Sequence, residues 1–285
     1  MQDVLTEMSA MCGKLDFRSE RISELSIRTK AMPVIRKLCS HPITRQLICE
    51  LIKKDRYTYR HCIGVAIVSY GIGMWSGMEE EAVQELAIAG FLHDIGKIKV
   101  PDSILKKAAP LTMDEYNEMS LHTFMGFDLL CHIPGMEEQQ ALVALQHHER
   151  EDGSGYPFGI AGGKITGQSK AVAIADVFHT MISERVYKQP VSLFRALREI
   201  YETAIPLFDV ELVHCFVFNI MNRAIDSEVL LSNGQVGRIV RLHADDLIHP
   251  IVHSSGTLFD TRRSKLEIVD FSGGDPNARS CLIIE

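Results

Sequence analysis

The residues best suited to chemistry in this chain are an imidazole and a carboxylate side by side, His93 and Asp94. They lie in the run Phe91-Leu92-His93-Asp94-Ile95-Gly96-Lys97, which ends an apolar stretch of helical spacing. Buried ionisable groups are costly unless they are paired or bind a metal. An aspartate has two oxygens and can bridge two ions while its histidine neighbour binds one. Lys97 would bring a positive charge toward an anion held by such ions. The run therefore indicates a metal site that acts on an anionic substrate.

Further histidines and an aspartate share the setting of this pair, at or near predicted helix ends or on inward helix faces. The full set is His61, His93, Asp94, His122, His147, His148 and Asp176. A single buried histidine is more often a core residue bonded to a backbone carbonyl than a metal ligand. Adjacent His-Asp and His-His pairs and an aspartate within an apolar helix would each be expensive without an ion, so the set as a whole favours metal binding. We expect surface or capping roles for the other histidines, which are His41, His132, His179, His214, His243, His249 and His253.

A glycine-rich stretch follows the paired histidines. It contains Asp152-Gly153-Ser154-Gly155-Tyr156-Pro157 and continues through residues 159–167 without helical periodicity. Loops of this length inside a compact domain are usually lids or binding walls. We therefore expect this loop to border the site.

Apolar residues at helical spacing predict the elements that position these groups. Helices are expected at 43–53, 55–77, 82–95, 111–119, 120–130, 139–148, 168–183, 191–204 and 208–224. Gly96 is expected to stop the helix that carries His93 and Asp94. Thr112 followed by Glu115 predicts a capping box at one helix start. The domain is thus expected to be mainly α.

The pattern changes at Ser227. Residues 235–242 alternate, 248–252 and 266–269 do so weakly, and Asn233-Gly234 is a turn signal. We predict three parts: an N-terminal helical segment at 1–54, a catalytic helical domain at 55–226, and a small β-rich C-terminal appendage at 227–285.

Composition restricts the class of protein. The chain has 285 residues, 46% of them hydrophobic, and a formal charge of -7, which argues against a protein that coats nucleic acid. The seven cysteines are scattered without a CxxC pair, which is typical of reduced thiols in a cytoplasmic protein. No stretch approaches the apolar length of a membrane span.

Several motifs in order resemble the HD-GYP family, the cyclic di-GMP phosphodiesterase branch of the HD phosphohydrolases. They are His93-Asp94-Ile95-Gly96-Lys97, His122, the run from His147 to Pro157, Ala175-Asp176-Val177-Phe178 and Arg185-Val186-Tyr187-Lys188. The similarity covers roughly residues 55–224 and implies an HD-type multi-helix bundle. The chain departs from the family at Thr123, where a proline is usual.

The resemblance implies two divalent metal ions. One would be bound by His61, His93, Asp94 and Asp176, and the other by His122, His147 and His148 with Asp94 bridging. Imidazole and carboxylate ligands suit iron or manganese, which the family implies, and are compatible with zinc. Some members hold a third metal through a glutamate four residues before the first histidine, and Tyr57 stands there, so two ions are expected.

The implied reaction is hydrolysis of cyclic di-GMP to pGpG, with further cleavage to GMP left open. Two ions would bind a bridging water and aim the resulting hydroxide at phosphorus, while Lys97 offsets charge on the phosphoryl oxygens. The resemblance assigns Arg185 and Lys188 to the ligand phosphate or guanine, and Gly155-Tyr156-Pro157 to the pocket wall. As an alternative, Arg185 and Lys188 would interact with a helix dipole.

Two other functions compete with this one. The first is a receptor that binds cyclic di-GMP with negligible turnover and signals to a partner protein such as a cyclase domain. The second is an HD hydrolase of another cyclic dinucleotide or of a nucleotide phosphate. The N-terminal helical segment fits a linker, a homodimer contact or the remainder of a sensor domain. No nucleic acid polymer is expected as a partner.

Overall fold

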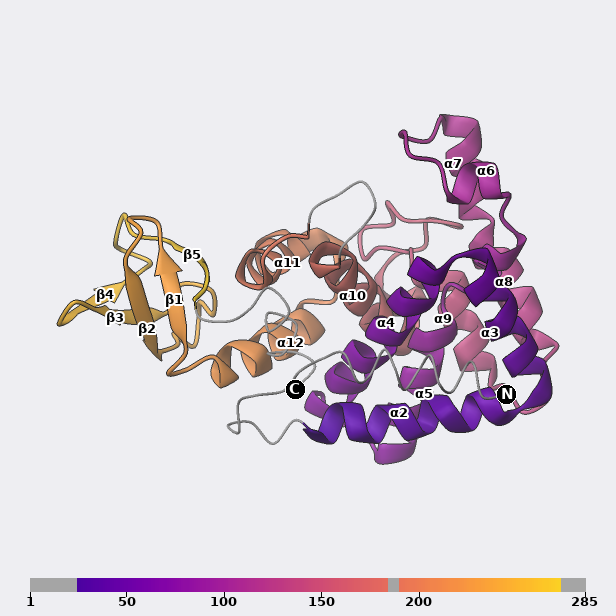
Figure 1. The fold of residues 1–285 in the computed structure, drawn as a ribbon, viewed down its shortest axis with the longest axis horizontal. Helices are drawn as coiled ribbons and strands as arrows, with labels where there is room; N and C mark the ends of the chain where they lie inside the picture. The colour runs from indigo at the N-terminus through magenta and orange to yellow at the C-terminus, as the bar shows by residue number, and fades with distance from the viewer. Residues whose placement is uncertain (1–24, 184–189, 273–285) are drawn as a thin grey trace.

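The computed structural model describes residues 25–183 and 190–272. Helices form the chain up to Arg223, and a small antiparallel sheet lies beyond them at one end of the molecule (Figure 1). The helices are α2 (Leu25–Ser40), α3 (Pro42–Lys54), α4 (Arg56–Trp75), α5 (Glu80–Leu92), η1 (Ile95–Lys99), α6 (Asp102–Leu105), α7 (Met113–Ser120), α8 (His122–Cys131), α9 (Glu138–Gln146), η2 (Gly162–Lys164), α10 (Gly167–Ile182), α11 (Leu193–Leu207) and α12 (Val210–Arg223). The strands are β1 (Glu228–Leu231), β2 (Val236–Arg241), β3 (Ile251–Ser254), β4 (Thr257–Asp260) and β5 (Ile268–Phe271). The expected fold class, mainly α with a small β appendage, is confirmed.

Side-chain caps fix the start of several helices, as their sequences predict. The Asp55 carboxylate accepts hydrogen bonds from the backbone N–H groups of Tyr57 and Thr58 at 3.0 and 3.2 Å, which begins α4. Thr112 and Glu115 form the predicted capping box at the start of α7. Helix α7 buries none of its residues, and with α6 it projects from the rest of the helices (Figure 1).

Two apolar clusters hold the helices together. One lies between α2, α3, α4, α5, α8 and α9, and includes Tyr59, Tyr70 and Phe91. The other runs through α10, α11 and α12, and continues into the sheet through residues such as Val229 and Ile268. The first and last of the three predicted parts thus share buried contacts with the middle one, and their boundaries stay predictions.

The sheet has the order β4-β3-β2-β1-β5, and all its neighbours are antiparallel. The predicted Asn233-Gly234 turn joins β1 to β2, with Gly234 at φ +83°. Residues 257–260 form β4, which we did not predict, and the burial of its residues does not alternate along the strand.

The predicted end of the helix that precedes Gly96 is wrong. Helix α5 ends at Leu92, so His93 caps it and Asp94 lies between α5 and η1. Gly96 lies inside η1 and serves close packing, because a Cβ there would overlap the carbonyl oxygen of His122. The glycine therefore brings the start of α8 against η1.

Within the described ranges, none of the helices combines the length and the apolar character needed to cross a bilayer. The cysteines described there, Cys39, Cys49, Cys62, Cys131 and Cys215, are free thiols.

Candidate metal centre

Seven residues that the sequence singles out meet in one buried region, which we call the His–Asp cluster. They are His61 on α4, His93 at the end of α5, Asp94 before η1, His122 at the start of α8, His147 and His148 after α9, and Asp176 on α10. All except His148 are buried, and His148 is partly exposed. Five separate helices thus contribute to the cluster, mostly through residues at their ends.

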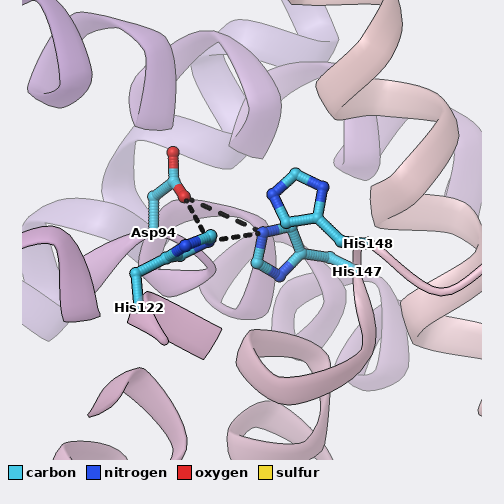
Figure 2. Close-up of side chains that lie close together, drawn as sticks. All are labelled: Asp94, His122, His147 and His148. Carbon is cyan, nitrogen blue, oxygen red and sulfur yellow. Dashed lines mark hydrogen bonds and ion pairs between the residues drawn. The ribbon is translucent and has the colours of Figure 1, made fainter. Parts of the chain in front are cut away.

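Asp94 occupies the centre of the cluster and uses its two oxygens on different sides. Its Oδ1 lies 3.3 Å from His122 Nε2 and 3.8 Å from His147 Nε2. Its Oδ2 lies 3.3 Å from His93 Nε2 and 4.0 Å from His61 Nε2. Figure 2 shows the first side, with Asp94, His122 and His147 joined by dashed lines and the His148 ring beside His147. One carboxylate is therefore shared by two groups of imidazoles.

Asp176 completes the side of the cluster that faces Oδ2. Its Oδ1 lies 2.9 Å from His61 Nε2 and 4.0 Å from His93 Nε2. The donor atoms of His61, His93 and Asp94 all lie within 4.8 Å of one another, as do those of Asp94, His122, His147 and His148. The second group is the one that the HD-GYP resemblance implies, and the first group together with Asp176 makes up the other.

The backbone determines which ring nitrogen faces the cluster. His93 Nδ1 lies 2.7 Å from Gly90 O, and His122 Nδ1 lies 2.8 Å from Met119 O. His147 Nδ1 lies 3.0 Å from the carbonyl oxygen of Ala144. A carbonyl only accepts hydrogen bonds, so each Nδ1 carries the proton and each Nε2 presents a lone pair.

These lone pairs fit a bound cation. His122 Nε2 and His147 Nε2 face each other at 3.4 Å, although each is left with a lone pair and no proton to share. Among the described residues, neither His93 Nε2 nor Asp94 Oδ1 has a hydrogen-bond partner, and both atoms are buried. Buried acceptors that converge without donors are stabilised by a metal ion. The residues present therefore fit divalent metals bound by nitrogen and oxygen.

The protonation states also suit metal binding. Burial lowers the pKa of His122 from 6.5 to about 4, and it lowers the pKa of His147 and of His148 well below the usual value. Burial alone would raise the pKa of Asp94, but the positive charge of Lys97 holds that pKa well below its usual range. His122, His147 and His148 as neutral imidazoles and Asp94 as an ionised carboxylate are in the forms that bind metal ions.

Lys97 lies at the edge of the cluster. Its Nζ donates a hydrogen bond to Asp94 Oδ2 at 2.6 Å, and its side chain is 22% exposed. Asp94 raises the pKa of this lysine against the effect of burial, so Lys97 is a cation beside the candidate metal sites.

The glycine-rich loop borders the cluster, as expected. The Tyr156 ring stacks on His148 with centroids 4.5 Å apart, and Tyr116 on α7 contacts Tyr156 edge to face with centroids 5.8 Å apart. Gly155 packs against the backbone of His148 and Glu149 so closely that a Cβ would overlap it. Pro157 follows in the same loop and is partly exposed.

Glu149 anchors this loop, a role that the sequence did not reveal. Its carboxylate is 2% exposed and accepts hydrogen bonds from the backbone N–H groups of Phe158 and Ile160 at 2.8 and 3.1 Å. The signal available was its place directly after the histidine pair, at the start of the loop.

Two expected ligand contacts cannot be placed, because Arg185 and Lys188 lie outside the described residues.

Tyr57, where some family members have a glutamate, stacks on His61 with ring centroids 6.2 Å apart. Thr123, in place of the usual proline, is buried in the first turn of α8, and its hydroxyl donates to Ser120 O at 2.9 Å. Helix α8 therefore still begins at His122, although Thr123 replaces the proline.

The sequence of this chain is similar to those of known proteins. The family model described as HD domain matches residues 49–212. The cyclic di-GMP phosphodiesterase PA4108 of Pseudomonas aeruginosa is 30% identical over 256 residues, which cover 88% of this chain and 61% of that protein. A cyclic di-GMP phosphodiesterase of Thermotoga maritima is 42% identical over 165 residues, covering 58% of this chain and 45% of that protein. This chain thus spans less than two thirds of the length of these relatives.

A solved structure shares the fold. Bd1817, a HDG"Y"P protein from Bdellovibrio bacteriovorus, matches with a TM-score of 0.50 and 12% identity, over 76% of this chain and 80% of that one. The chain therefore belongs to the HD domain family.

Proposed function

We propose that this protein is a metal-dependent phosphodiesterase that hydrolyses cyclic di-GMP to pGpG. The observation that carries the proposal is the position of Asp94, whose two oxygens face two separate groups of imidazoles. A carboxylate placed in this way can join two cations that act on one phosphodiester. The curated relatives named for this activity, at 30% and 42% identity, support the substrate.

The His–Asp cluster would hold two divalent ions, with iron or manganese as the expected metals. His61, His93, Asp94 and Asp176 would bind one, and His122, His147, His148 and Asp94 the other. When bound, such ions supply Lewis-acid stabilisation of the phosphoryl charge and lower the pKa of a nucleophilic water.

The protein residues around the cluster orient the substrate and exclude water. Lys97 places a positive charge beside the reacting phosphate, where it offsets the charge that grows on the phosphoryl oxygens. Tyr156 and its neighbours Gly155 and Pro157 form one wall of the pocket. Arg185 and Lys188 are proposed to contact a ligand phosphate or a guanine.

The N-terminal segment and the sheet are proposed to serve regulation. Residues 1–54 would mediate homodimer formation or link to a partner such as a cyclase domain. The described part of this segment packs through α2 and α3 on α4 and α5, which places it on the helices that carry His61 and His93.

The test is hydrolysis by purified protein loaded with Fe²⁺ or Mn²⁺ and then freed of excess metal. Cyclic di-GMP, cyclic di-AMP and mixed cyclic dinucleotides are compared, and products are separated by chromatography with metal content measured in parallel. We expect cyclic di-GMP to give pGpG, and chelation to stop the reaction. Metal-loaded protein that binds cyclic di-GMP without product would favour the receptor function, and hydrolysis of another dinucleotide would change the substrate.

Asp94→Asn is the matched variant for this assay. The amide cannot bridge two cations as a carboxylate does, so we expect turnover to fall by about a thousandfold or more, since the ions contribute several kcal/mol. Asp128→Asn is the control, because this aspartate lies on α8 with 76% of its side chain exposed. Retention of turnover by Asp94→Asn would refute the bridging role.

A further inference from the structure

His61 is held differently from the other imidazoles of the His–Asp cluster whose Nδ1 contacts are described above. His93, His122 and His147 each direct Nδ1 to the carbonyl oxygen of the residue three positions earlier in the chain. His61 Nδ1 instead lies 3.0 Å from Nδ1 of another side chain, His179. This contact joins residues 118 positions apart in the chain, on α4 and α10.

Side chains of helix α10 contact both nitrogens of the His61 ring. Asp176 lies 2.9 Å from Nε2 through its Oδ1, and His179 reaches Nδ1. The two residues are three positions apart on the helix and therefore share a face. The rings of His61 and His179 approach with centroids 5.1 Å apart. Rotation of the His61 ring would break both contacts.

Gly64 makes room for this arrangement. It follows His61 by one turn of α4, and a Cβ at this position would overlap the His179 ring. Ser183 lies on another side of that ring, with its Oγ 3.1 Å from His179 Nδ1. The His179 imidazole is therefore seated between α4 and the end of α10.

We propose that His179 is a positioning residue for the metal centre: it accepts the Nδ1–H of His61 and so directs the Nε2 lone pair of His61 at the ion shared with Asp176. The inference rests on the metal centre of the proposed function. Metal-binding histidines generally donate their second N–H to a fixed acceptor, which sets the tautomer and the ring orientation. His179 does for His61 what backbone carbonyls do for His93, His122 and His147.

The test measures metal affinity rather than turnover. His179→Phe keeps an aromatic ring against Gly64 but removes the acceptor, so we expect Mn²⁺ binding at one of two positions to weaken about 10- to 100-fold. His179→Asn restores an acceptor and should bind Mn²⁺ within a few-fold of wild type. Gly64→Ala displaces the His179 ring without altering its nitrogen and should weaken the same position. Binding is followed by calorimetric titration of metal-free protein with Mn²⁺.

His132→Phe is the control, because this histidine is exposed beyond the end of α8. Thermal unfolding of each metal-free variant shows whether the fold is kept. Wild-type affinity and stoichiometry in His179→Phe would overturn the inference and leave the proposed function standing. Equal weakening in His179→Asn and His179→Phe would also overturn it, since the acceptor would then be irrelevant. A wild-type protein that binds no Mn²⁺, Fe²⁺ or Zn²⁺ would overturn both.

Discussion

Each imidazole that faces Asp94 depends on a hydrogen bond made on its far side. The carbonyl oxygens of Gly90, Met119 and Ala144 keep the protons of three histidines away from the cluster. The lone pairs then converge in a buried region, where proton uptake is opposed by desolvation. The position of each proton thus leaves the Nε2 atoms free to bind cations.

The pKa of His122 predicts how metal-free protein responds to acid. This pKa is lowered by burial from 6.5 to about 4, so below pH 6.5 the unfolded chain takes up a proton that the folded protein does not. The contribution of His122 to stability is complete above pH 6.5 and is lost as the pH falls toward 4, on the order of 3 kcal/mol in total. Urea unfolding of chelated protein across this range measures it.

His122→Asn should give a shallower dependence of unfolding free energy on pH than wild type. His132→Asn, at an exposed position, is the control. The same slope in His122→Asn and wild type would contradict the assignment of this proton uptake to His122.

At this scale the sequence predicted much of the cluster and missed its support. All seven expected residues meet. They could be predicted because the number of histidines and the adjacent His-Asp and His-His pairs are unusual in the sequence. His179 was expected to have a surface or capping role, and the structure places it against His61 instead. Contacts between residues 118 positions apart depend on how α4 and α10 pack, which spacing along the chain does not reveal.

Among the elements, the loop between α9 and α10 has the most direct effect on the site. Glu149 accepts hydrogen bonds from the backbone N–H groups of Phe158 and Ile160 in this loop. Tyr156 N donates to His148 O at 3.2 Å. The position of the Tyr156 ring on His148 therefore depends on the backbone of the loop. Its glycines differ in what they contribute.

Gly155→Ala should displace the loop from the histidine pair. The added Cβ would overlap the backbone of His148 and Glu149, so we expect a higher KM and a lower kcat for the dinucleotide, by about tenfold or more in kcat/KM. Gly163→Ala is the matched control, because a Cβ there meets nothing within 4 Å. Steady-state kinetics of both variants makes the comparison, and equal values would show that the close packing at Gly155 is unimportant.

Most helices could be predicted from apolar spacing and caps, as Asp55 and Thr112 show. The end of α5 could not. Gly96 looked like a helix stop, but it is selected by the approach of α8, a tertiary contact. Strand β4 was missed because its residues lie on an outer edge of the sheet and do not alternate in burial.

At the scale of the whole molecule, the sheet and the helices share one apolar cluster. Arg198 on α11 also donates to the carbonyl oxygen of Ile268 on β5 at 3.0 Å. We therefore expect the sheet and the helices next to it to unfold together, although the sequence changes character at Ser227.

Ile268→Ala tests this coupling. Ile268 is 3% exposed, and its truncation should lower the free energy of unfolding by about 2–4 kcal/mol. The loss should appear equally in the helical signal of circular dichroism and in the fluorescence of Trp75, which packs against the same cluster. Val269→Ala, 49% exposed on the next position, should change little. An unchanged helical transition in Ile268→Ala would show that the sheet is an independent unit.

The carbonyl anchors of His93, His122 and His147 bear on how such a protein evolves. Because each anchor is main chain, located three residues earlier, most neighbouring side chains can be replaced without disturbing the imidazole that it holds. The His61 support has less protection, since it is lost when His179 is replaced by a residue without an acceptor or when a larger residue at Gly64 displaces the His179 ring. Related sequences should therefore vary freely around His93, His122 and His147, whereas around His61 they should keep a small residue at position 64 and a hydrogen-bond acceptor at position 179.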